Sequence, residues 1–195
     1  MFRACLGNFA TGVTIVTCEV DHQLHGATVS SFTSVSVDPP LVLVCLNKKA
    51  KAAEYLRDRP FTVNILTVSQ RDHALHFAGR EQPHLELQFQ ETPNGPRLEN
   101  CLAYVTCEPW RVYDAGDHML VLGEVIDIEM DDEEPLLFYR GGFWSIGASV
   151  VVPDDGGSSD PAVKIADAEA LELVTIGTGT WISDEGYDVH LHRSW

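Results

Sequence analysis

His118 is an ionisable imidazole at the start of a run of residues that otherwise has the character of a buried strand. It stands in DAGDHMLVLGEVIDI (residues 114–128), directly after an acid–glycine–acid turn and ahead of an almost wholly apolar segment. One interpretation is a turn residue that happens to be histidine. The other is that the strand forms the wall of a site and His118 faces a ligand, since imidazole can stack on a ring and donate a hydrogen bond.

Three lysines gather where an apolar strand is expected to meet a helix, in the segment LNKKAKAAEYL. They are Lys48, Lys49 and Lys51, in a chain with 13 Lys and Arg residues and a formal net charge of −16. A helix N-terminus offers unpaired N–H groups and the positive end of the helix dipole, which suits a phosphate. Arg80, directly after Gly79, would add a second cation. The alternative is a solvated basic helix face, but clustering in so acidic a chain favours an anion pocket.

Hydroxyl groups crowd a strand-like segment, ATVSSFTSVS (27–36). They belong to Thr28, Ser30, Ser31, Thr33 and Ser34. Such hydroxyls and the neighbouring N–H groups could hydrogen-bond the polar edge of a heteroaromatic ring. The alternative is a Ser/Thr-rich edge strand without a ligand.

Several familiar motifs are missing from the sequence. No GxGxxG follows a strand, and there is no Walker loop and no GxSxG elbow, so a Rossmann nucleotide site is not expected. His190 and His192 have strand spacing, but no neighbouring ligand completes a metal site, so no metal is predicted. The remaining histidines in turns or on helix faces are treated as surface residues: His22, His73, His76 and His84.

Composition narrows the class of protein. With 195 residues, 45% of them hydrophobic and 22% charged, the chain is expected to form a soluble globular domain with a substantial core. The charge of −16 argues against nucleic acid and anionic membrane surfaces as partners. No apolar run is long enough for a membrane span and no signal peptide is recognised, so we expect a cytoplasmic protein. Five cysteines without a CxxC pair indicate reduced thiols.

Most of the chain is predicted to form β-structure. Strands are expected over 12–20, 27–36, 41–46, 61–67, 101–113, 118–130 and 135–146. Helices are expected over 49–58 and 69–79, the second ending on Gly79. This order predicts a mainly β protein, a closed or split β-barrel with a few short helices, in one domain over residues 1–150. Residues 151–195 would be a tail with an acidic linker, PDDGGSSDP (153–161), and a segment that could add a strand.

Seven segments in this order resemble the flavin reductase-like domain family, whose fold is an FMN-binding split barrel. The resemblance covers residues 2 to about 146. The segments are FATGVTIVT, HGATVSSFTSVSVDPPLVLVCLNKKAK, FTVNILT, FAGR, CLAYVTCE, DAGDHMLVLGEV and PLLFYRGGF. The tail ADAEALELVTIGTGTWIS is also similar to that of the subgroup serving aromatic and steroid-degrading hydroxylases.

The resemblance implies a homodimeric reductase that oxidises NADH and reduces a flavin. FAD is expected, with FMN possible, and NADH is expected rather than NADPH. The reduced flavin would diffuse to a separate flavin-dependent monooxygenase component. The resemblance further implies that Ser30 and Ser31 touch the isoalloxazine edge, and that His118, of the Gly-Asp-His motif, lies over the flavin beside the nicotinamide.

The other site residues implied by the resemblance fall into two groups. Residues expected to bind flavin along its ribityl chain and phosphate, or close to the ring, are Thr28, Cys45, Leu46, Asn47, Lys48, Lys49, Ala50, Lys51, Ala52, Gly79 and Arg80. Residues expected to contact the nicotinamide dinucleotide are His25, Gly26, Ala27, Thr28 and Tyr139, together with His118.

One departure from the family pattern concerns the phosphate. Many relatives carry Ser or Thr where this chain has Ala50 and Ala52. The loss of two neutral hydrogen bonds is worth roughly 1–3 kcal/mol, which would leave the flavin held loosely enough to be released.

Two alternatives to a flavin reductase stay open. One is a non-catalytic flavin- or haem-binding carrier or sensor. The other is a pyridoxamine phosphate oxidase-type enzyme, which would need more basic residues.

Overall fold

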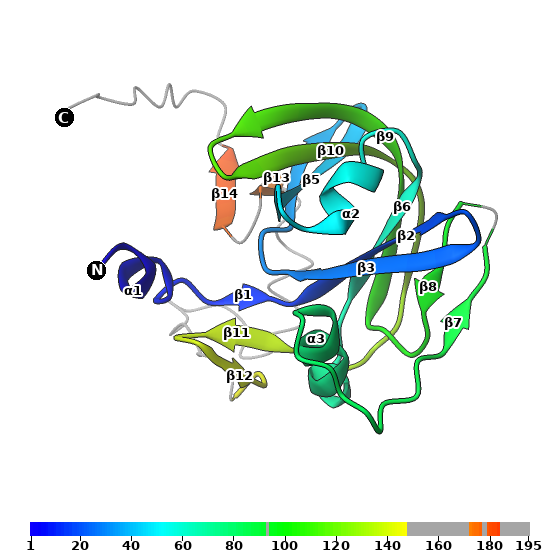
Figure 1. Ribbon diagram of the computed structural model, residues 1–195. Coiled ribbons are helices and arrows are strands. Elements are labelled where there is room, and N and C mark those ends of the chain that lie inside the picture. Colours follow the sequence, from blue (N-terminus) through cyan, green and yellow to red (C-terminus); the bar gives the residue numbers. More distant parts are fainter. Residues whose placement is uncertain (93, 148–171, 177–178, 184–195) are drawn as a thin grey trace.

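The computed structural model describes residues 1–92, 94–147, 172–176 and 179–183. Its main feature is a seven-stranded antiparallel sheet in the order β3-β2-β6-β9-β10-β5-β4, which curls around a core (Figure 1). The strands are β2 (Thr14–Val20), β3 (Gln23–Val29), β4 (Thr33–Val37), β5 (Pro40–Asn47), β6 (Phe61–Ile65), β9 (Ala103–Ala115) and β10 (His118–Met130). The predicted mainly β class is confirmed.

Two of the three tight hairpins in this sheet bear on the site, and the third joins β4 to β5. Strands β2 and β3 are joined by Asp21 and His22, both with positive φ, and β9 and β10 are joined by Gly116 and Asp117. The first turn is shorter than the stretch 21–26 left between the predicted strands 12–20 and 27–36, because β3 lies at the edge of the sheet, where polar side chains are tolerated. The second hairpin places His118 as the first residue of β10, as the sequence predicts.

The single strand predicted over 27–36 is wrong. The chain leaves the sheet at Ser30, and β3 and β4 lie at opposite edges of it, paired with β2 and β5 respectively. Residue preferences are β-forming on both sides of this break, so they give no sign that the chain crosses from one edge to the other. The crossing loop is where the site described below is built.

The strand predicted over 135–146 is also wrong. It is a hairpin of β11 (Leu137–Tyr139) and β12 (Gly142–Trp144), which turns at Arg140 and Gly141, both with positive φ. This hairpin pairs with β1 (Thr11–Gly12) in a separate three-stranded sheet. A further pair, β7 (Phe89–Gln90) and β8 (Arg97–Leu98), was not predicted, nor was α1 (Phe2–Leu6).

Both predicted helices are present and shorter than expected. They are α2 (Lys51–Tyr55) and α3 (Arg71–Phe77), the latter preceded by the 3₁₀ turn η1 (Val68–Gln70). Helix α2 packs on β2, β3 and β5, and α3 packs on β2 and β3. Strand β3 is therefore flanked by both helices.

The core consists of two groups of fully buried side chains. One fills the barrel and includes Phe61, Val63 and Val121, with Ala52 and Leu56 of the α2 segment packed into it. The other lies under α3 and includes Ile15 and Leu66. The two groups hold α2 and α3 in place on either side of β3.

Part of the C-terminal region is described. Strands β13 (Glu172–Ile176) and β14 (Gly179–Ser183) pair with each other in a two-stranded sheet and do not extend the main one. The acidic linker over 153–161 lies outside the described residues. The division into residues 1–150 and 151–195 stays a prediction.

Candidate active site

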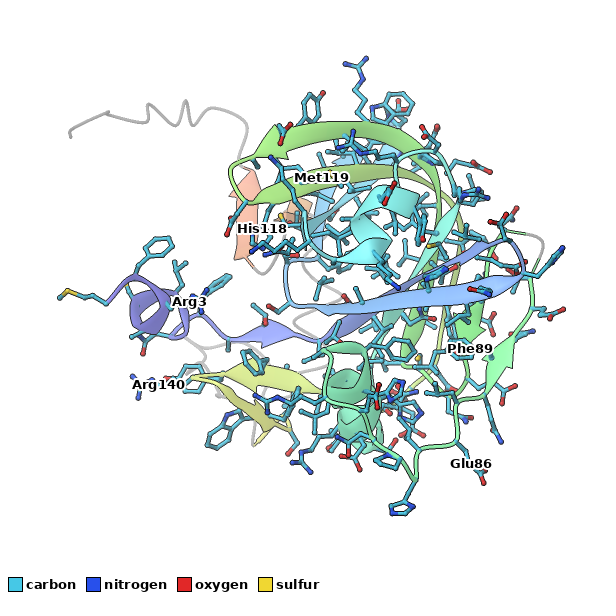
Figure 2. All side chains as sticks on the ribbon, in the orientation of Figure 1. Arg3, Glu86, Phe89, His118, Met119 and Arg140 are labelled. Atoms are coloured by element: carbon cyan, nitrogen blue, oxygen red, sulfur yellow. The ribbon has the colours of Figure 1, made fainter. Side chains whose placement is uncertain are left out.

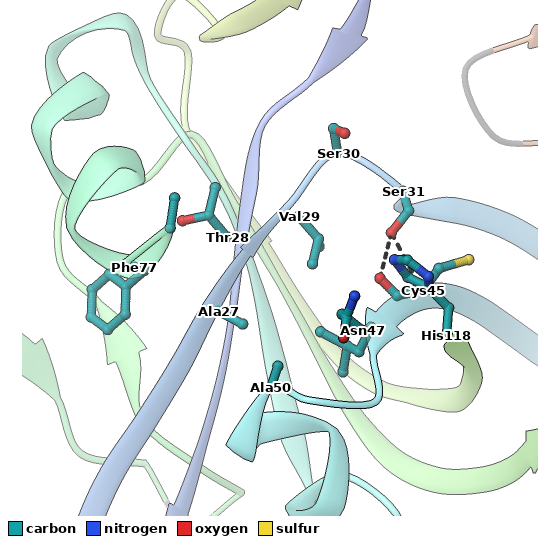
Figure 3. Close-up of a pocket in the computed structure, with 12 residues that line it drawn as sticks. Ala27, Thr28, Val29, Ser30, Ser31, Cys45, Asn47, Ala50, Phe77 and His118 are labelled. Atoms are coloured by element: carbon teal, nitrogen blue, oxygen red, sulfur yellow. Dashed lines mark hydrogen bonds between the residues drawn. The ribbon is translucent and has the colours of Figure 1, made fainter. Parts of the chain in front are cut away.

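A groove of about 500 Å³ opens where β3, the crossing loop, the end of β5 and the start of β10 meet (Figure 3). Its walls are completed by the N-cap of α2 and the C-terminal end of α3. The lining residues are Ala27, Thr28, Val29, Ser30, Ser31, Cys45, Leu46, Asn47, Ala50, Phe77, Ala78 and His118. Ala27 and Ala50 contribute only methyl groups to this lining (Figure 3).

Ser31 ties the crossing loop to β5. Its hydroxyl accepts a hydrogen bond from the Cys45 N–H at 2.9 Å and donates one to the Cys45 carbonyl at 3.0 Å. The hydroxyl proton is therefore committed to the backbone, and one lone pair remains. At this edge of the groove, a ligand's acceptor atoms can be reached by the hydroxyl of exposed Ser30. Burial raises the pKa of the Cys45 thiol, so Cys45 is a neutral wall residue.

Helix α3 is seated on β3 by two contacts. Thr28 donates its hydroxyl proton to the carbonyl of Ala74 at 2.7 Å. Gly26 provides the second contact, because a Cβ at this position would lie 2.7 Å from ring carbons of Phe77. Gly26 thus lets Phe77 approach the strand, and Phe77 forms a wall of the groove.

His118 faces the groove from the opposite side. In the β10 register it is paired with Asn47 on β5 and Ala115 on β9, so strands on both sides hold its backbone. Its Nδ1 lies 2.7 Å from the Asp117 carboxylate, and 42% of its side chain is exposed. The hydrogen bond from His118 lowers the pKa of Asp117 below its ordinary value. When Nδ1 carries the proton, Nε2 is left free to accept a hydrogen bond.

The N-terminus of α2 forms the end of the groove near Asn47. The Ala50 N–H donates to the Asn47 carbonyl at 2.9 Å, and the Lys49 N–H donates to the Asn47 side-chain oxygen at 2.9 Å. Ala50 is the N-cap and offers no side-chain oxygen to the helix. Ala52 is 5% exposed and faces the core, so a hydroxyl there would not point into the groove.

The three lysines of the predicted anion pocket differ in their surroundings. Lys48 forms an ion pair with Asp114, which lowers the pKa of Asp114, and its N–H donates to the Asp117 carbonyl at 3.0 Å. Lys48 therefore holds the β9–β10 turn beside His118 and does not line the groove. Lys49 and Lys51 are exposed, and no salt bridge to either is formed within the described part of the chain.

The remaining predicted residues lie around the groove or away from it. Gly79, with φ of 82°, ends α3, and Arg80 follows it outside the lining. His25 packs against Tyr55, with the two ring planes tilted by 46°. Tyr139 is on β11, in the other sheet, with Arg140 over its ring and Trp144 beside it. Seven of the thirteen predicted flavin residues line the groove, namely Thr28, Ser30, Ser31, Cys45, Leu46, Asn47 and Ala50. Tyr139, predicted to contact the nicotinamide dinucleotide, lies outside it, on the hairpin with Arg140, which is well separated from His118 (Figure 2).

Three lining residues were missed by the sequence prediction: Val29, Phe77 and Ala78. Val29 follows from strand alternation, since it shares a face with Ala27. Phe77 and Ala78 directly precede Gly79 and Arg80 in the FAGR segment, of which only Gly79 and Arg80 are predicted to bind flavin. The aromatic ring two residues before the glycine that ends the predicted helix was the available signal.

The flavin reductase like domain matches residues 6–147 of the sequence, well over half of the chain. The chain belongs to this family. An NADH-dependent flavin reductase of Rhodococcus sp is 41% identical over 148 residues, covering 74% of this chain and 84% of the relative. The flavin-dependent monooxygenase reductase subunit HsaB of Rhodococcus jostii is 38% identical over 185 residues and covers 93% of this chain and 90% of its own, so its match extends into the tail.

Solved structures of the family have the same fold. Flavin reductase PheA2 in its native state superimposes with a TM-score of 0.73 at 38% identity, over 75% of this chain and 97% of that one. The NADH:FAD oxidoreductase SgcE6 of Streptomyces globisporus, in complex with NAD and FAD fragments, gives a TM-score of 0.66 at 34% identity, over 80% of this chain and 93% of that one. The split-barrel prediction is confirmed.

Two further observations concern other classes of site. Within the described ranges, no three His, Cys, Asp or Glu side chains are grouped so as to hold a metal ion. Among the helices that the structure describes, none combines the length and the apolar character needed to cross a bilayer.

Proposed function

We propose that this protein is an NADH-dependent flavin reductase that supplies reduced flavin to a separate monooxygenase. The observation that carries the proposal is the groove, which has the residues of the family motifs on its walls and His118 at its mouth. Relatives named as NADH-dependent flavin reductases or as reductase components of monooxygenases support it. The carrier or sensor and the pyridoxamine phosphate oxidase alternatives have no comparable support.

FAD and NADH are the proposed substrates, in line with the NADH-dependent FAD reductase relative and the complex with NAD and FAD fragments. When both are bound, the flavin accepts a hydride from the nicotinamide. For that step two flat rings must be stacked within about 3–3.5 Å, so the main contribution of the chain is positioning. The apolar surface of Ala27 and Val29 gives the flavin ring a floor, and the hydroxyl of Ser30 reaches its polar edge.

His118 is the proposed contact with the nicotinamide. It lies at the open side of the groove, where a second ring would cover the first, and Asp117 fixes its orientation. Gly26 and Thr28, which are predicted to contact the dinucleotide, act indirectly in this proposal. They hold α3 against β3, and α3 carries Phe77, a wall of the groove. Lys49, Lys51 and Arg80, which lie outside the groove lining, are the cations available to phosphates at its ends.

We further propose a homodimer in the cytoplasm. Apolar side chains are left exposed on and after α1, with Phe2 at 76%, Leu6 at 56% and Phe9 at 57%, which favours burial against a second copy. All five cysteines are free thiols, which fits a reducing compartment. Analytical ultracentrifugation of the protein measures the oligomeric state, and a monomer at micromolar concentration contradicts this part of the proposal.

The test of the function is NADH oxidation by the purified protein with FAD, with FMN and without added flavin. Turnover that depends on added flavin, faster with FAD, is the expected result. Transfer is then measured by coupling the reaction to a flavin-dependent monooxygenase kept apart by a dialysis membrane. Absence of turnover with both flavins, although the protein binds them, contradicts the proposal and favours a carrier.

A further inference from the structure

Asp114 lies on the rim of the barrel, at the end that the α2 segment closes. On β9 it is paired with Met119 of β10, which is paired in turn with Leu46 of β5. Directly opposed residues of neighbouring strands point to the same face of the sheet, and Met119 and Leu46 are both buried in the barrel core. Asp114 is on this inner face but exposed to solvent, so its carboxylate stands where the core ends.

Two cations of the α2 segment lie close to this carboxylate. Lys48, which precedes α2, forms an ion pair with Asp114. Arg57, which follows α2, donates from Nη2 to the Sδ atom of Met119 at 2.8 Å. The hydrogen bond from Lys48, and to a smaller extent the charge of Arg57, hold the pKa of Asp114 below its ordinary value. Asp114 is thus attached to both flanks of α2.

The Lys48–Asp114 ion pair spans the start of β10. Lys48 follows Asn47, the last residue of β5, whereas Asp114 lies on β9, and β10 runs between these two strands. Lys48 also binds the turn directly, since its N–H donates to the Asp117 carbonyl at 3.0 Å. The turn that carries His118 is therefore held from the strands on both sides of it.

These contacts determine where the imidazole of His118 lies. Figure 2 shows His118 and Met119 at the start of β10, beside α2. Consecutive residues of a strand point to opposite faces, so Met119 enters the core while His118 faces the groove. The same α2 segment provides Ala50, which lines the flavin end of the groove. Asp114 thereby connects the two ends of the site through α2.

We propose that Asp114 is a positioning residue for the nicotinamide contact. By pairing with Lys48 and Arg57 it fixes His118 relative to the flavin end of the groove, and it touches neither substrate itself. The inference rests on the proposed function and deepens it, because it names a residue outside the groove lining that controls how NADH is held.

The sign of the effect separates positioning from simple electrostatics. NADH is an anion and the chain has a formal net charge of −16, so removal of one carboxylate strengthens the attraction of NADH and lowers its KM. Loss of positioning raises the KM instead. Asp114→Asn removes the charge and keeps the size of the side chain, which makes the two explanations predict opposite changes.

The experiment measures the KM for NADH and, separately, the Kd for flavin. Asp114→Asn and Lys48→Gln are each expected to raise the KM about two- to fivefold, the range expected for an exposed ion pair, and to leave the Kd unchanged. The double variant should be no worse than either single one, because both remove the same interaction. Asp114→Glu, which keeps the carboxylate, should behave like the native protein.

Asp132→Asn is the matched control, since Asp132 is an exposed aspartate that makes no salt bridge within the described ranges. It should leave the KM for NADH unchanged. A lower or unchanged KM in Asp114→Asn overturns the proposal. Additive effects of Lys48→Gln and Asp114→Asn overturn it as well, because they show that the two side chains act independently.

Hydrogen exchange separates this inference from the proposed function. The Lys48 N–H donates to the turn, so its exchange rate, followed by NMR without any substrate, reports how firmly the turn is held. Exchange that is about twofold or more faster in Asp114→Asn, and unchanged in Asp132→Asn, supports the positioning role even if no flavin is reduced. Equal exchange in the native protein and Asp114→Asn overturns it, whether or not the protein oxidises NADH.

Discussion

The hydroxyl of Ser31 holds both polar backbone groups of Cys45, accepting from its N–H at 2.9 Å and donating to its carbonyl at 3.0 Å. Strand β4 pairs with β5 only from Thr33 onward. Ser31 therefore replaces, with one side chain, the backbone hydrogen bonds that the crossing loop cannot make. The consequence is a groove wall whose position depends on a hydroxyl that is not free to donate to a ligand.

Replacement of this hydroxyl is the first prediction. Ser31→Ala leaves two partly buried backbone groups without a partner, and we expect it to lower the free energy of unfolding by roughly 1–3 kcal/mol. Ser30→Ala, at the exposed neighbouring hydroxyl, should change it by less than about 0.5 kcal/mol. Urea denaturation measures both, and Ser31→Thr, which keeps a hydroxyl, is the control. Equal stability of the two alanine variants would show that the Ser31–Cys45 bonds contribute nothing.

The second prediction concerns His118. If its imidazole orients the nicotinamide, His118→Ala raises the KM for NADH more than it weakens flavin binding. Asp117→Asn keeps a hydrogen-bonding side chain next to the ring but removes the charge, and a smaller rise is expected. Steady-state kinetics at saturating FAD, with flavin binding measured separately, gives both quantities. An unchanged KM for NADH in His118→Ala removes this residue from the site.

The position of His118 at the start of β10 could be predicted from the sequence, because it is determined by residues next to it in the chain. An acid–glycine–acid turn followed by an apolar run specifies a hairpin, and the first residue after the turn lies at the strand mouth. The groove lining at Thr28, Ser31 and Asn47 followed from the family resemblance. The hydrogen-bond partners of these residues did not follow from it. Thr28 meets Ala74, and Ser31 meets Cys45, only after the chain has folded across the barrel. Asn47 meets Lys49 only where the chain turns into α2.

The errors have the same physical origin. The segment 27–36 is β-forming throughout, so its local preferences do not reveal that Ser30 leaves one edge of the sheet for the other. The role of Lys48 in phosphate binding stays a prediction, but its ion pair with Asp114 was not foreseen, because Asp114 lies on β9 and is brought near by the pairing of β10 with both β9 and β5. Ion pairs and edge crossings between distant segments are decided by tertiary structure, which a single sequence does not display.

Gly26 gives the third prediction. An added Cβ would lie 2.7 Å from the Phe77 ring, so Gly26→Ala must push α3 away from β3. We expect a loss of about 1–3 kcal/mol in unfolding free energy and a higher KM for flavin, since Phe77 forms a wall of the groove. At Gly12 nothing lies within 4 Å of an added Cβ, which makes Gly12→Ala the matched control.

A double variant tests the cause of this effect. In Gly26→Ala combined with Phe77→Leu, the smaller side chain removes the overlap, so the two changes should be less harmful together than their sum. Additive losses would indicate that Gly26 acts independently of the seat of α3.

The fourth prediction follows from the buried thiols. Burial raises the pKa of Cys18 to about 11, and those of Cys101 and Cys107 to about 12, from an ordinary value of 9.0. The folded protein keeps these protons while the unfolded chain loses them, so the stability they contribute is complete below pH 9 and is lost as the pH rises toward the folded pKa values. The free energy of unfolding should therefore fall progressively above pH 9.

The contribution of one thiol is isolated by comparing how steeply the free energy of unfolding falls with pH in the native protein and in a variant that lacks the thiol. Cys107→Ala removes a buried group that titrates only in the unfolded chain over this range, so its unfolding free energy should fall less steeply above pH 9 than that of the native protein. Cys5→Ala, at an exposed thiol, should leave the slope unchanged. Denaturant titrations at a series of alkaline pH values measure both. If the slope for Cys107→Ala matches the native one, desolvation of this thiol is not a source of the alkaline instability.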